Sequence, residues 1–256
     1  MALAGVAVWT GQIALAPSAP AATGEHYSDV ADAFHSQALK PLPETLNLDP
    51  SKVALGQRLF NDPRLSADDT VACSTCHNLA MGGADRQARS RGIGGREGEV
   101  NTPTVFNSAF SFAHFWDGRA ASLEDQVDGP LHHPCEMGSN WREVIPKLEA
   151  DPEYFASFKM VYPGGITADN VKDAIATFER SLITPNSRFD RFLRGEVNAL
   201  SSEEQSGYQM FKSYGCVACH QGVNIGGNMF QTFGVVGDYF NDRGEVGDAD
   251  LGRFNV

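Results

Sequence analysis

Hydrophobic residues recur at helical spacing in several stretches of the chain, and the clearest stretch covers residues 167–182. Thr167 is the expected N-terminal cap, and Asp169 lies in the first turn, where a negative charge favours the helix dipole. The apolar stripe of this helix consists of Val171, Ile175, Phe178 and Leu182. The pattern therefore predicts an amphipathic helix with one buried face.

Shorter stretches with the same periodicity predict further helices. They cover residues 51–60, 122–128, 141–150, 151–160 and 189–193, and another helix begins at Ser201 or Ser202. We expect Asn61-Asp62-Pro63 to end the first of them and Gly129-Pro130 to end the second, because proline does not continue a helix. Residues 81–100 are rich in glycine and arginine without helical periodicity, which predicts a loop. No stretch alternates as a β-strand does, so the expected fold class is all-α.

Two copies of the pattern C-x-x-C-H lie far apart in the chain. They are Cys73-Ser74-Thr75-Cys76-His77 and Cys216-Val217-Ala218-Cys219-His220. This pattern attaches a c-type haem, because each thiol can form a thioether with a vinyl group and the histidine can bind the iron. The alternatives are a Cys/His zinc site or a pair of disulfides. Since the two copies use four of only five cysteines, two covalently bound haems are the better interpretation.

Two haem motifs in an all-α chain of 256 residues predict two tandem c-type cytochrome domains, each around one haem. Thr184-Pro185-Asn186 breaks the helical pattern and is the expected boundary. Residues 23–186 then form the first domain. Residues 187–256 form the second, which ends in a glycine-rich tail from Gly226 onward.

Residues 1–22 contain an apolar run followed by small residues and prolines, which is typical of the end of a secretory signal peptide. A basic n-region is missing before this run, and the alternatives are a disordered tail or a membrane anchor. The run is short for a transmembrane helix, so no membrane span is expected. Covalent haem attachment takes place outside the bacterial cytoplasm, which agrees with a periplasmic location.

The formal net charge of the chain is −12 at pH 7. Proteins that bind nucleic acids usually present a basic face, so this balance argues against a nucleic-acid partner. An acidic surface suits a partner protein with a basic docking patch, although acidity also serves solubility alone.

Seven stretches carry a family likeness: GQRLFNDPRLS, CSTCHNLAMGGAD, NTPTVFNSAF, FWDGRA, DPEYFASFK, TFERSLITPNSRFD and GCVACHQGVNIGGNMFQTFG. Together they resemble the bacterial dihaem cytochrome c peroxidases, a superfamily shared with MauG-like enzymes. The resemblance runs from about Leu42 to the end of the chain. It implies an enzyme that reduces hydrogen peroxide with electrons from a small cytochrome c or a cupredoxin, and it suggests a homodimer.

The resemblance also implies different roles for the two haems. The first is expected to be the peroxidatic, low-potential haem, and it is held by Cys73, Cys76 and His77. The second is expected to take electrons from the donor and pass them on, and it is held by Cys216, Cys219 and His220.

Five further site residues follow from the same resemblance. Gln126 and Glu136 match the polar pair of the peroxide pocket, and Phe115 is expected to pack nearby. Trp116 lies where the superfamily has a tryptophan between the haems. Asn101 matches a residue of a calcium site between the domains.

The chemistry of peroxide cleavage supports a role for Glu136 independently. Heterolytic cleavage needs an open iron position and a group that moves a proton from the near oxygen to the far one. Glu136 can move that proton, and Gln126 can hold the peroxide by hydrogen bonds. Without the resemblance, a glutamate before Met137-Gly138 is more often a helix-start or surface residue, and Trp116 is more often part of a core.

One departure from the superfamily concerns the loop after the first haem. Many members carry a histidine there that caps the resting iron and leaves when the other haem is reduced. Residues 81–100 contain no histidine, and Ile93 stands at the matching position. Because isoleucine cannot bind iron, the first haem is expected to be five-coordinate or water-bound at rest, and the enzyme to be active without reductive activation. His114 is the nearest alternative ligand, but its aromatic surroundings favour a structural or surface role.

A second departure is the end of the chain, which is expected to be truncated because superfamily members continue further. That continuation holds the methionine that usually completes the second haem, and part of the calcium site. Met229 is the candidate ligand within the chain, although packing is the better interpretation. Cys135 directly precedes Glu136 and is interpreted as a packed free thiol. His132 and His133 are a pair on a loop, where a solvated or haem-edge position is expected rather than a metal site.

Three functions stay open on the sequence. The leading hypothesis is a periplasmic dihaem peroxidase. The second is a MauG-like oxidase that modifies a partner protein, and the third is a dihaem electron-transfer cytochrome without enzymatic activity. Gln126, Glu136 and an uncapped first haem argue against the third. The distal ligand of the second haem is the feature that separates the first two.

Overall fold

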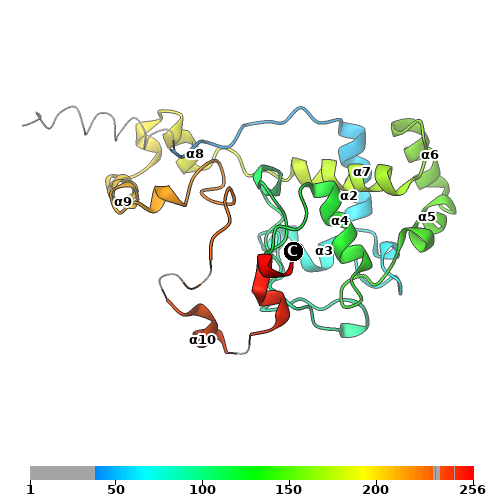
Figure 1. Cartoon of the computed structure of the whole chain (residues 1–256). Coiled ribbons are helices and arrows are strands. Elements are labelled where there is room, and N and C mark those ends of the chain that lie inside the picture. The colour runs from blue at the N-terminus through cyan, green and yellow to red at the C-terminus, as the bar shows by residue number, and fades with distance from the viewer. Residues whose placement is uncertain (1–37, 233, 235–236, 245) are drawn as a thin grey trace, which may run out of the picture.

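The computed structural model describes residues 38–232, 234, 237–244 and 246–256, and the expected signal peptide lies outside these residues. The described part consists of α-helices, short 3-10 helices and connecting loops (Figure 1). Its only β-structure is three isolated bridges, so the all-α prediction is confirmed. None of the described helices is long and apolar enough to cross a membrane.

Two helices far apart in the sequence, α2 (Pro50–Phe60) and α7 (Ala168–Ser181), form the centre of the first part of the chain. They lie close enough that a Cβ atom on Gly56 would come within 1.9 Å of the carbonyl oxygen of Ala174. Helix α7 begins at the predicted cap, where the Thr167 hydroxyl accepts a hydrogen bond from the amide of Asn170. The predicted helices over residues 51–60 and 167–182 are therefore confirmed.

Three more helices surround this pair and complete one hydrophobic core. They are α4 (Leu123–His132), α5 (Trp141–Glu149) and α6 (Pro152–Val161). The largest side chains that are fully buried in the core are Tyr154, Phe60, Phe158, Leu59, Leu65, Leu131, Leu148 and Ile175. The helices predicted over residues 141–150 and 151–160 are confirmed by α5 and α6.

Helix α4 runs further than predicted, because it passes through Gly129-Pro130 and ends at His132. The prediction that this dipeptide ends the helix is wrong. Continuing the helix buries Leu131, which is only 1% exposed. The amide of Met137 also bonds to the Pro130 carbonyl at 3.1 Å, so the next loop satisfies a backbone acceptor that the helix leaves open.

The second part of the chain contains α8 (Arg188–Leu193), a 3-10 turn at Val197–Ala199, and α9 (Ser202–Ser213). Ser201 caps α9 in a capping box with Glu204, as predicted. The rings of Phe189, Phe192 and Tyr208 pack edge-to-face between α8 and α9. No residue of α9 is fully buried, so this helix has little protein core of its own.

An extended arm before α2 crosses the molecule and contacts the second part (Figure 1). The amide of Leu42 donates to Asp190 Oδ1 at 2.8 Å, and the amide of Gly222 donates to the carbonyl of Ala38 at 2.8 Å. Residues 38–42 are thus neighbours in space of residues that the sequence assigns to the second domain. The domain boundary at Thr184-Pro185-Asn186 stays a prediction.

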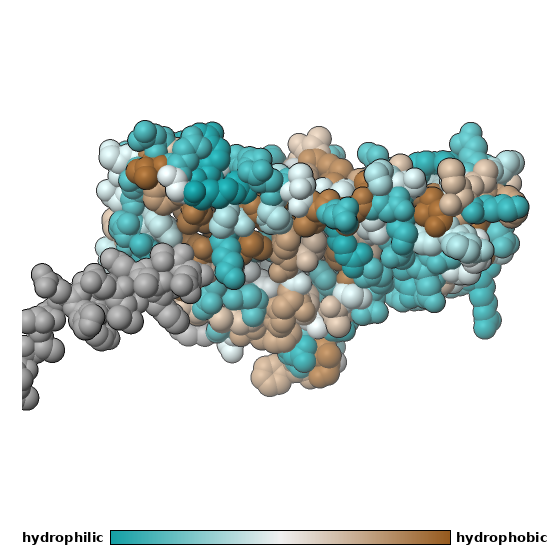
Figure 2. All heavy atoms as spheres, turned by 90° about the horizontal axis from the view of Figure 1, so that it is seen from above, coloured by the Kyte–Doolittle hydropathy of each residue, from teal (hydrophilic) through white to brown (hydrophobic). Residues whose placement is uncertain are grey.

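The glycine-rich tail contains two short helices, α10 (Tyr239–Arg243) and a 3-10 segment over Asp248–Asn255. The guanidinium of Arg253 stacks over the ring of Phe230 at 4.3 Å and donates to the Asp117 carbonyl at 3.3 Å. The tail therefore returns to the loop that precedes α4. In the view from above, the surface is largely polar, with hydrophobic residues exposed in patches between the polar ones (Figure 2).

Candidate functional site

The first haem motif forms one helical turn, α3 (Cys73–Cys76), directly after the buried Val71-Ala72. The amide of His77 donates to the carbonyl of Cys73 at 2.9 Å, which brings the histidine under the turn that carries both thiols. His77 Nδ1 lies 3.2 Å from the carbonyl oxygen of Gly83. This contact fixes the ring and leaves Nε2 as the ligand atom.

The protonation of this motif also suits haem attachment. Burial raises the pKa of the Cys73 thiol to about 12, so the thiol stays protonated. When the thioether forms, this proton moves to the vinyl group of the haem. Burial likewise lowers the pKa of His77, which favours the neutral imidazole that binds iron. Phe60 is fully buried and lies with its ring 6.4 Å from that of His77.

The second motif repeats the same arrangement on a 3-10 turn, Cys216–Ala218. The amide of His220 donates to the carbonyl of Cys216 at 2.9 Å, and His220 Nδ1 lies 3.0 Å from the carbonyl oxygen of Ile225. Phe211 of α9 lies 6.0 Å from the His220 ring, centroid to centroid. Both motifs thus place two thiols on one turn and hold the histidine through Nδ1, and both fit a covalently bound haem c.

Residues 101–120 lie between the two motifs and contact the loops after both. On the first side, the amide of Val105 donates to the Gly83 carbonyl at 3.1 Å, the same carbonyl that holds His77. On the second side, Asn224 Nδ2 donates to the carbonyl of Asn107 at 3.1 Å, next to Ile225. The stretch therefore links the two histidine-holding loops by hydrogen bonds.

Three predicted site residues, Asn101, Phe115 and Trp116, occupy this linking stretch. Trp116 Nε1 donates to the carbonyl of Asn101 at 2.9 Å, and the Asn101 side chain donates to the carbonyl of Gln87 at 2.6 Å. Among the residues that the structure describes, no group of three or more His, Cys, Asp or Glu side chains could hold a metal ion. A calcium site at Asn101 stays a prediction.

Glu136 lies in the turn after α4, against the loop that follows the first motif. The amide of Ile93 donates to the carbonyl of Glu136 at 2.8 Å. A Cβ atom on Gly92 would come within 2.1 Å of the Cys135 carbonyl oxygen, so only glycine allows this approach. The side chain of Ile93 packs on Gly138. Ile93, which the sequence resemblance matches to a capping histidine, thus makes an aliphatic contact beside Glu136.

The loop is also closed on itself. Arg91 pairs with Glu97 at 2.9 Å, and the amide of Gly92 donates to the carbonyl of Arg96 at 2.9 Å. Arg96 reaches across to the Pro134 carbonyl at 2.8 Å. The predicted loop over residues 81–100 is confirmed, and its tip is fastened to the Glu136 turn.

The Glu136 side chain is 44% exposed, and His133, Arg119 and Glu99 lie within electrostatic range of its carboxyl. Burial raises the pKa of Glu136 above its ordinary value, while His133 and Arg119 act in the opposite direction. The Arg119 guanidinium stacks on the Phe115 ring at 3.6 Å. That ring packs on Gly129 of α4, where a Cβ would come within 2.4 Å of Phe115 Cζ. The structure thus brings Glu136, Arg119 and Phe115 to one side of α4.

Gln126 lies one helical turn before Gly129 and is half-buried. Residues three apart on a helix share a face, so Gln126 lies on the face of α4 that carries the Phe115 contact. The other candidates lie apart from this face or in packed positions. His114 pairs with Ala120 through backbone atoms, and burial lowers the pKa of its side chain.

Cys135 is a half-buried free thiol. His132 is exposed, and its ring lies 6.4 Å from that of Trp141. Gln231 Nε2 lies 3.1 Å from the sulfur of Met229 and 3.9 Å from that of Cys219, which places Met229 near the second motif. Ligation by Met229 stays untested.

Glu179 is a buried acid near the first motif that sequence reasoning missed. Its Oε2 has no hydrogen-bond partner in the described part of the chain, and its charge acts on Cys73. Burial raises the pKa of Glu179 to about 8. The sequence does contain a signal for the burial of Glu179, because this residue lies four positions after Ile175 on the apolar stripe of α7.

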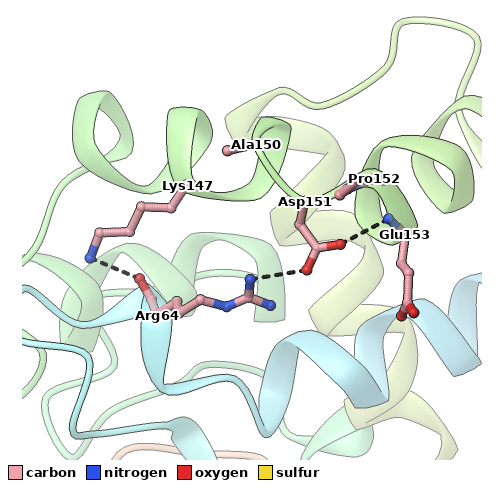
Figure 3. Close-up of a pocket in the computed structure, with 6 residues that line it drawn as sticks. All are labelled: Arg64, Lys147, Ala150, Asp151, Pro152 and Glu153. Atoms are coloured by element: carbon pink, nitrogen blue, oxygen red, sulfur yellow. Dashed lines mark hydrogen bonds and ion pairs between the residues drawn. The ribbon is translucent and has the colours of Figure 1, made fainter.

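A surface pocket lies beside α5 and α6, and none of its lining residues belongs to either motif (Figure 3). Its charged groups pair with each other: Arg64 bonds to Asp151 at 3.0 Å, and Lys147 bonds to the Arg64 carbonyl at 3.2 Å. Arg64 also pairs with the buried Asp62. Since these charges are neutralised within the protein, the pocket has a structural explanation.

The family model described as di-haem cytochrome c peroxidase matches residues 50–198, which include the first motif. Cytochrome c peroxidase Ccp of Escherichia coli is 48% identical over 235 residues, which are 91% of this chain and 50% of that protein. Cytochrome c551 peroxidase of Pseudomonas aeruginosa is 40% identical over 238 residues, 88% of this chain and 68% of that one. The chain thus spans about half to two thirds of the length of these relatives.

A solved structure is similar over much of the chain. It is a MauG-like protein associated with microbial copper homeostasis, with a TM-score of 0.65 and 29% identity, covering 73% of this chain and 57% of that one. Fold, motifs and family match therefore agree on two haem c attachment sites. The chain belongs to the di-haem cytochrome c peroxidase family.

Proposed function

We propose that the protein is a periplasmic peroxidase that reduces hydrogen peroxide to water with electrons from a small cytochrome c or a cupredoxin. The names of its relatives support this activity class. The chain supplies two haem attachment sites and one acid, Glu136, in the turn that contacts the loop after the first motif. A calcium ion near Asn101 and a homodimer belong to the same proposal.

One observation carries the proposal most strongly. Ile93 stands where many relatives have a capping histidine, and its amide is bonded to the Glu136 carbonyl at 2.8 Å. The loop 81–100 therefore offers no imidazole to the first haem, and it holds the acid at the same time. A haem that keeps an open position beside an acid is suited to peroxide chemistry.

The proposed chemistry divides between the haems and the protein. When bound, the first haem would supply redox-active iron for the reduction of peroxide, and the second would supply electrons. Glu136 accepts the proton of the near peroxide oxygen and returns it to the far oxygen, so that the O–O bond breaks with release of water. Gln126 orients the peroxide by hydrogen bonds, and Phe115 excludes water. Trp116 lies in the stretch that links the two motifs and is proposed to assist electron transfer.

The assay that tests this function is peroxide-dependent oxidation of a reduced small cytochrome c. The haem-loaded protein is used fully oxidised, without a reductive pre-treatment. Turnover from the first seconds is expected, because no histidine has to leave the first haem. Absence of turnover, both in this state and after reduction of one haem, would overturn the peroxidase proposal.

A second candidate is oxidation of a partner protein, as in MauG-like enzymes. The solved MauG-like structure is the observation that favours it. The two functions share the first haem and differ in the reductant. Peroxide consumption that needs a protein substrate and does not oxidise the small cytochrome would identify this second function.

A further inference from the structure

Residues 114–120 form a closed loop that carries Phe115, and we call them the Phe115 loop. The amide of His114 donates to the Ala120 carbonyl at 2.9 Å, and the amide of Gly118 donates to the Phe115 carbonyl at 3.1 Å. Phe115 has a φ of +67°, in the left-handed region that a bulky aromatic residue rarely adopts. Such a conformation costs energy and persists only where the surrounding contacts hold it.

The Phe115 side chain is held on the side of the first motif. A Cβ atom on Gly129 of α4 would come within 2.4 Å of Phe115 Cζ, so the ring lies directly on the helix backbone. The Arg119 guanidinium stacks on the ring at 3.6 Å and pairs with Asp117 at 2.9 Å. These contacts act on the ring, and the Asp117-Gly118 backbone behind it is held from elsewhere.

Phe230, in the loop that follows the second haem motif, packs on this backbone. A Cβ atom on Gly118 would come within 2.4 Å of Phe230 Cε1, so the ring lies against the turn itself. The Phe230 ring also meets the Phe112 ring edge-to-face, with 4.7 Å between centroids. The Arg253 guanidinium stacks over Phe230 at 4.3 Å and donates to the Gly118 carbonyl at 3.4 Å. Phe230 thus contacts both the turn and the chain just before the loop.

The segment that carries Phe230 is tied to the second haem motif. His220 Nδ1 lies 3.0 Å from the Ile225 carbonyl oxygen, and the amide nitrogen of the Gln231 side chain lies 3.9 Å from the Cys219 sulfur. Between these two contacts, the Gly227 carbonyl accepts a hydrogen bond from the amide of Phe112 at 3.2 Å. The position of Phe230 therefore depends on the loop that the second motif holds.

We propose that Phe230 is a positioning residue that holds the Phe115 loop and thereby keeps the Phe115 ring at the peroxide pocket. The second haem unit then has a role besides the supply of electrons, because its loop supports a wall of the first pocket. The inference rests on the proposed peroxidase function. Phe230 acts through Phe115 and does not touch peroxide.

Hydrogen exchange tests the structural half of this inference without any turnover. Phe230→Ala is compared with Phe254→Ala, the same change at a side chain that is 93% exposed in the same tail. In the haem-loaded, oxidised protein, we expect the amides of residues 114–120 to exchange about tenfold faster in F230A, while those of α7 stay slow. F254A should match the unchanged protein.

A double-mutant cycle tests whether Phe230 acts through Phe115. We expect kcat/KM for peroxide to fall about 10- to 100-fold in F230A, because the pocket wall is misplaced. Phe115→Ala should also be slow, and the double variant F115A/F230A should be no slower than F115A, since the ring that Phe230 positions is already gone. Reduction of the second haem by the donor protein should keep its rate in all three variants.

Phe230→Leu keeps an apolar contact without the ring and should fall between F230A and the unchanged protein in both measurements. It replaces F230A in the cycle if F230A does not load both haems.

The outcomes separate the two proposals. If F230A matches F254A in hydrogen exchange and in kcat/KM, the role of Phe230 is wrong and the peroxidase stands. If the loop exchanges faster at unchanged kcat/KM, or if the effects of F115A and F230A multiply, Phe230 does not act through Phe115 and the inference is also wrong. If the unchanged protein does not reduce peroxide, the peroxidase proposal fails, and hydrogen exchange alone decides whether Phe230 holds the loop.

Discussion

At the scale of single residues, chemistry could be read from the sequence only where a motif fixes it. The five-residue haem motifs determine which thiols and which histidine act together, and the structure holds both histidines through Nδ1. Glu136 was proposed mainly from its context in a family motif. Its approach to His133, 3.6 Å between Oε1 and Nδ1, could not be predicted, because it depends on how the turn after α4 closes.

Replacing Glu136 with glutamine tests the role of this acid. Glutamine keeps the shape and can still donate hydrogen bonds, but it cannot accept the peroxide proton. We expect kcat/KM for peroxide to fall by about 10²- to 10⁴-fold, measured by oxidation of a reduced small cytochrome c. Glu149→Gln, at an exposed position of α5, is the control. An E136Q protein within twofold of E149Q would exclude Glu136 as the acid.

Glu179 predicts a pH dependence of stability. Its pKa is raised to about 8 in the fold, so between pH 4.5 and pH 8 the folded protein keeps a proton that the unfolded chain has lost. The stabilisation is complete at low pH and disappears as the pH rises through this window, by at most about 1.4 kcal/mol per pH unit. Glu179→Gln removes this dependence.

Thermal unfolding of the haem-loaded protein at several pH values measures this effect. The melting temperature of E179Q relative to the unchanged protein should rise from pH 5 to pH 8. The E149Q control should show no such trend. An identical pH trend in E179Q and the unchanged protein would mean that Glu179 is ionised in the fold.

At the scale of elements, hydrophobic periodicity predicted the positions of the helices. The rule that glycine and proline end a helix gave a wrong C-terminal end for α4. Thr167 and Ser201 cap α7 and α9 as predicted, since capping depends on neighbouring residues. Gly129-Pro130 does not end α4, because the burial of Leu131 outweighs the lost backbone bond. That balance depends on tertiary contacts, which no local pattern contains.

The contact between α2 and α7 gives a prediction at this scale. A Cβ on Gly56 would lie 1.9 Å from the Ala174 carbonyl oxygen and 2.8 Å from Phe178 Cβ. Gly56→Ala should therefore separate the helices and lower the free energy of unfolding by about 3 kcal/mol, measured by denaturant unfolding. Gly164→Ala is the matched control, because its Cβ would meet only Asn170 Nδ2 at 3.6 Å. Equal stability of the two variants would contradict this packing.

At the scale of the whole molecule, the sequence predicted two haem units but not how they are connected. The arm at residues 38–42 contacts Asp190 and Gly222, which are distant in sequence. Asn107 also joins the two units, because its carbonyl accepts a hydrogen bond from Asn224 Nδ2. Such long-range pairings arise from chain folding and have no local signature.

The second unit is expected to depend on its haem for stability. Helix α9 has no fully buried residue, so the haem must supply most of the apolar surface against which it packs. Cys216→Ser with Cys219→Ser removes the covalent attachment. Amide hydrogen exchange of α9 should become fast, while that of α7 stays slow. Unchanged protection in α9 would show that the second unit has a sufficient protein core.

The central claim is that Ile93 leaves the first haem open beside Glu136 in the resting protein. Electron paramagnetic resonance of the fully oxidised, haem-loaded protein tests it most directly. The account predicts a high-spin ferric signal from the first haem before any reductant is added. A low-spin signal of a haem with two histidine ligands at this position would contradict it, since another histidine would then occupy the place that Ile93 leaves free.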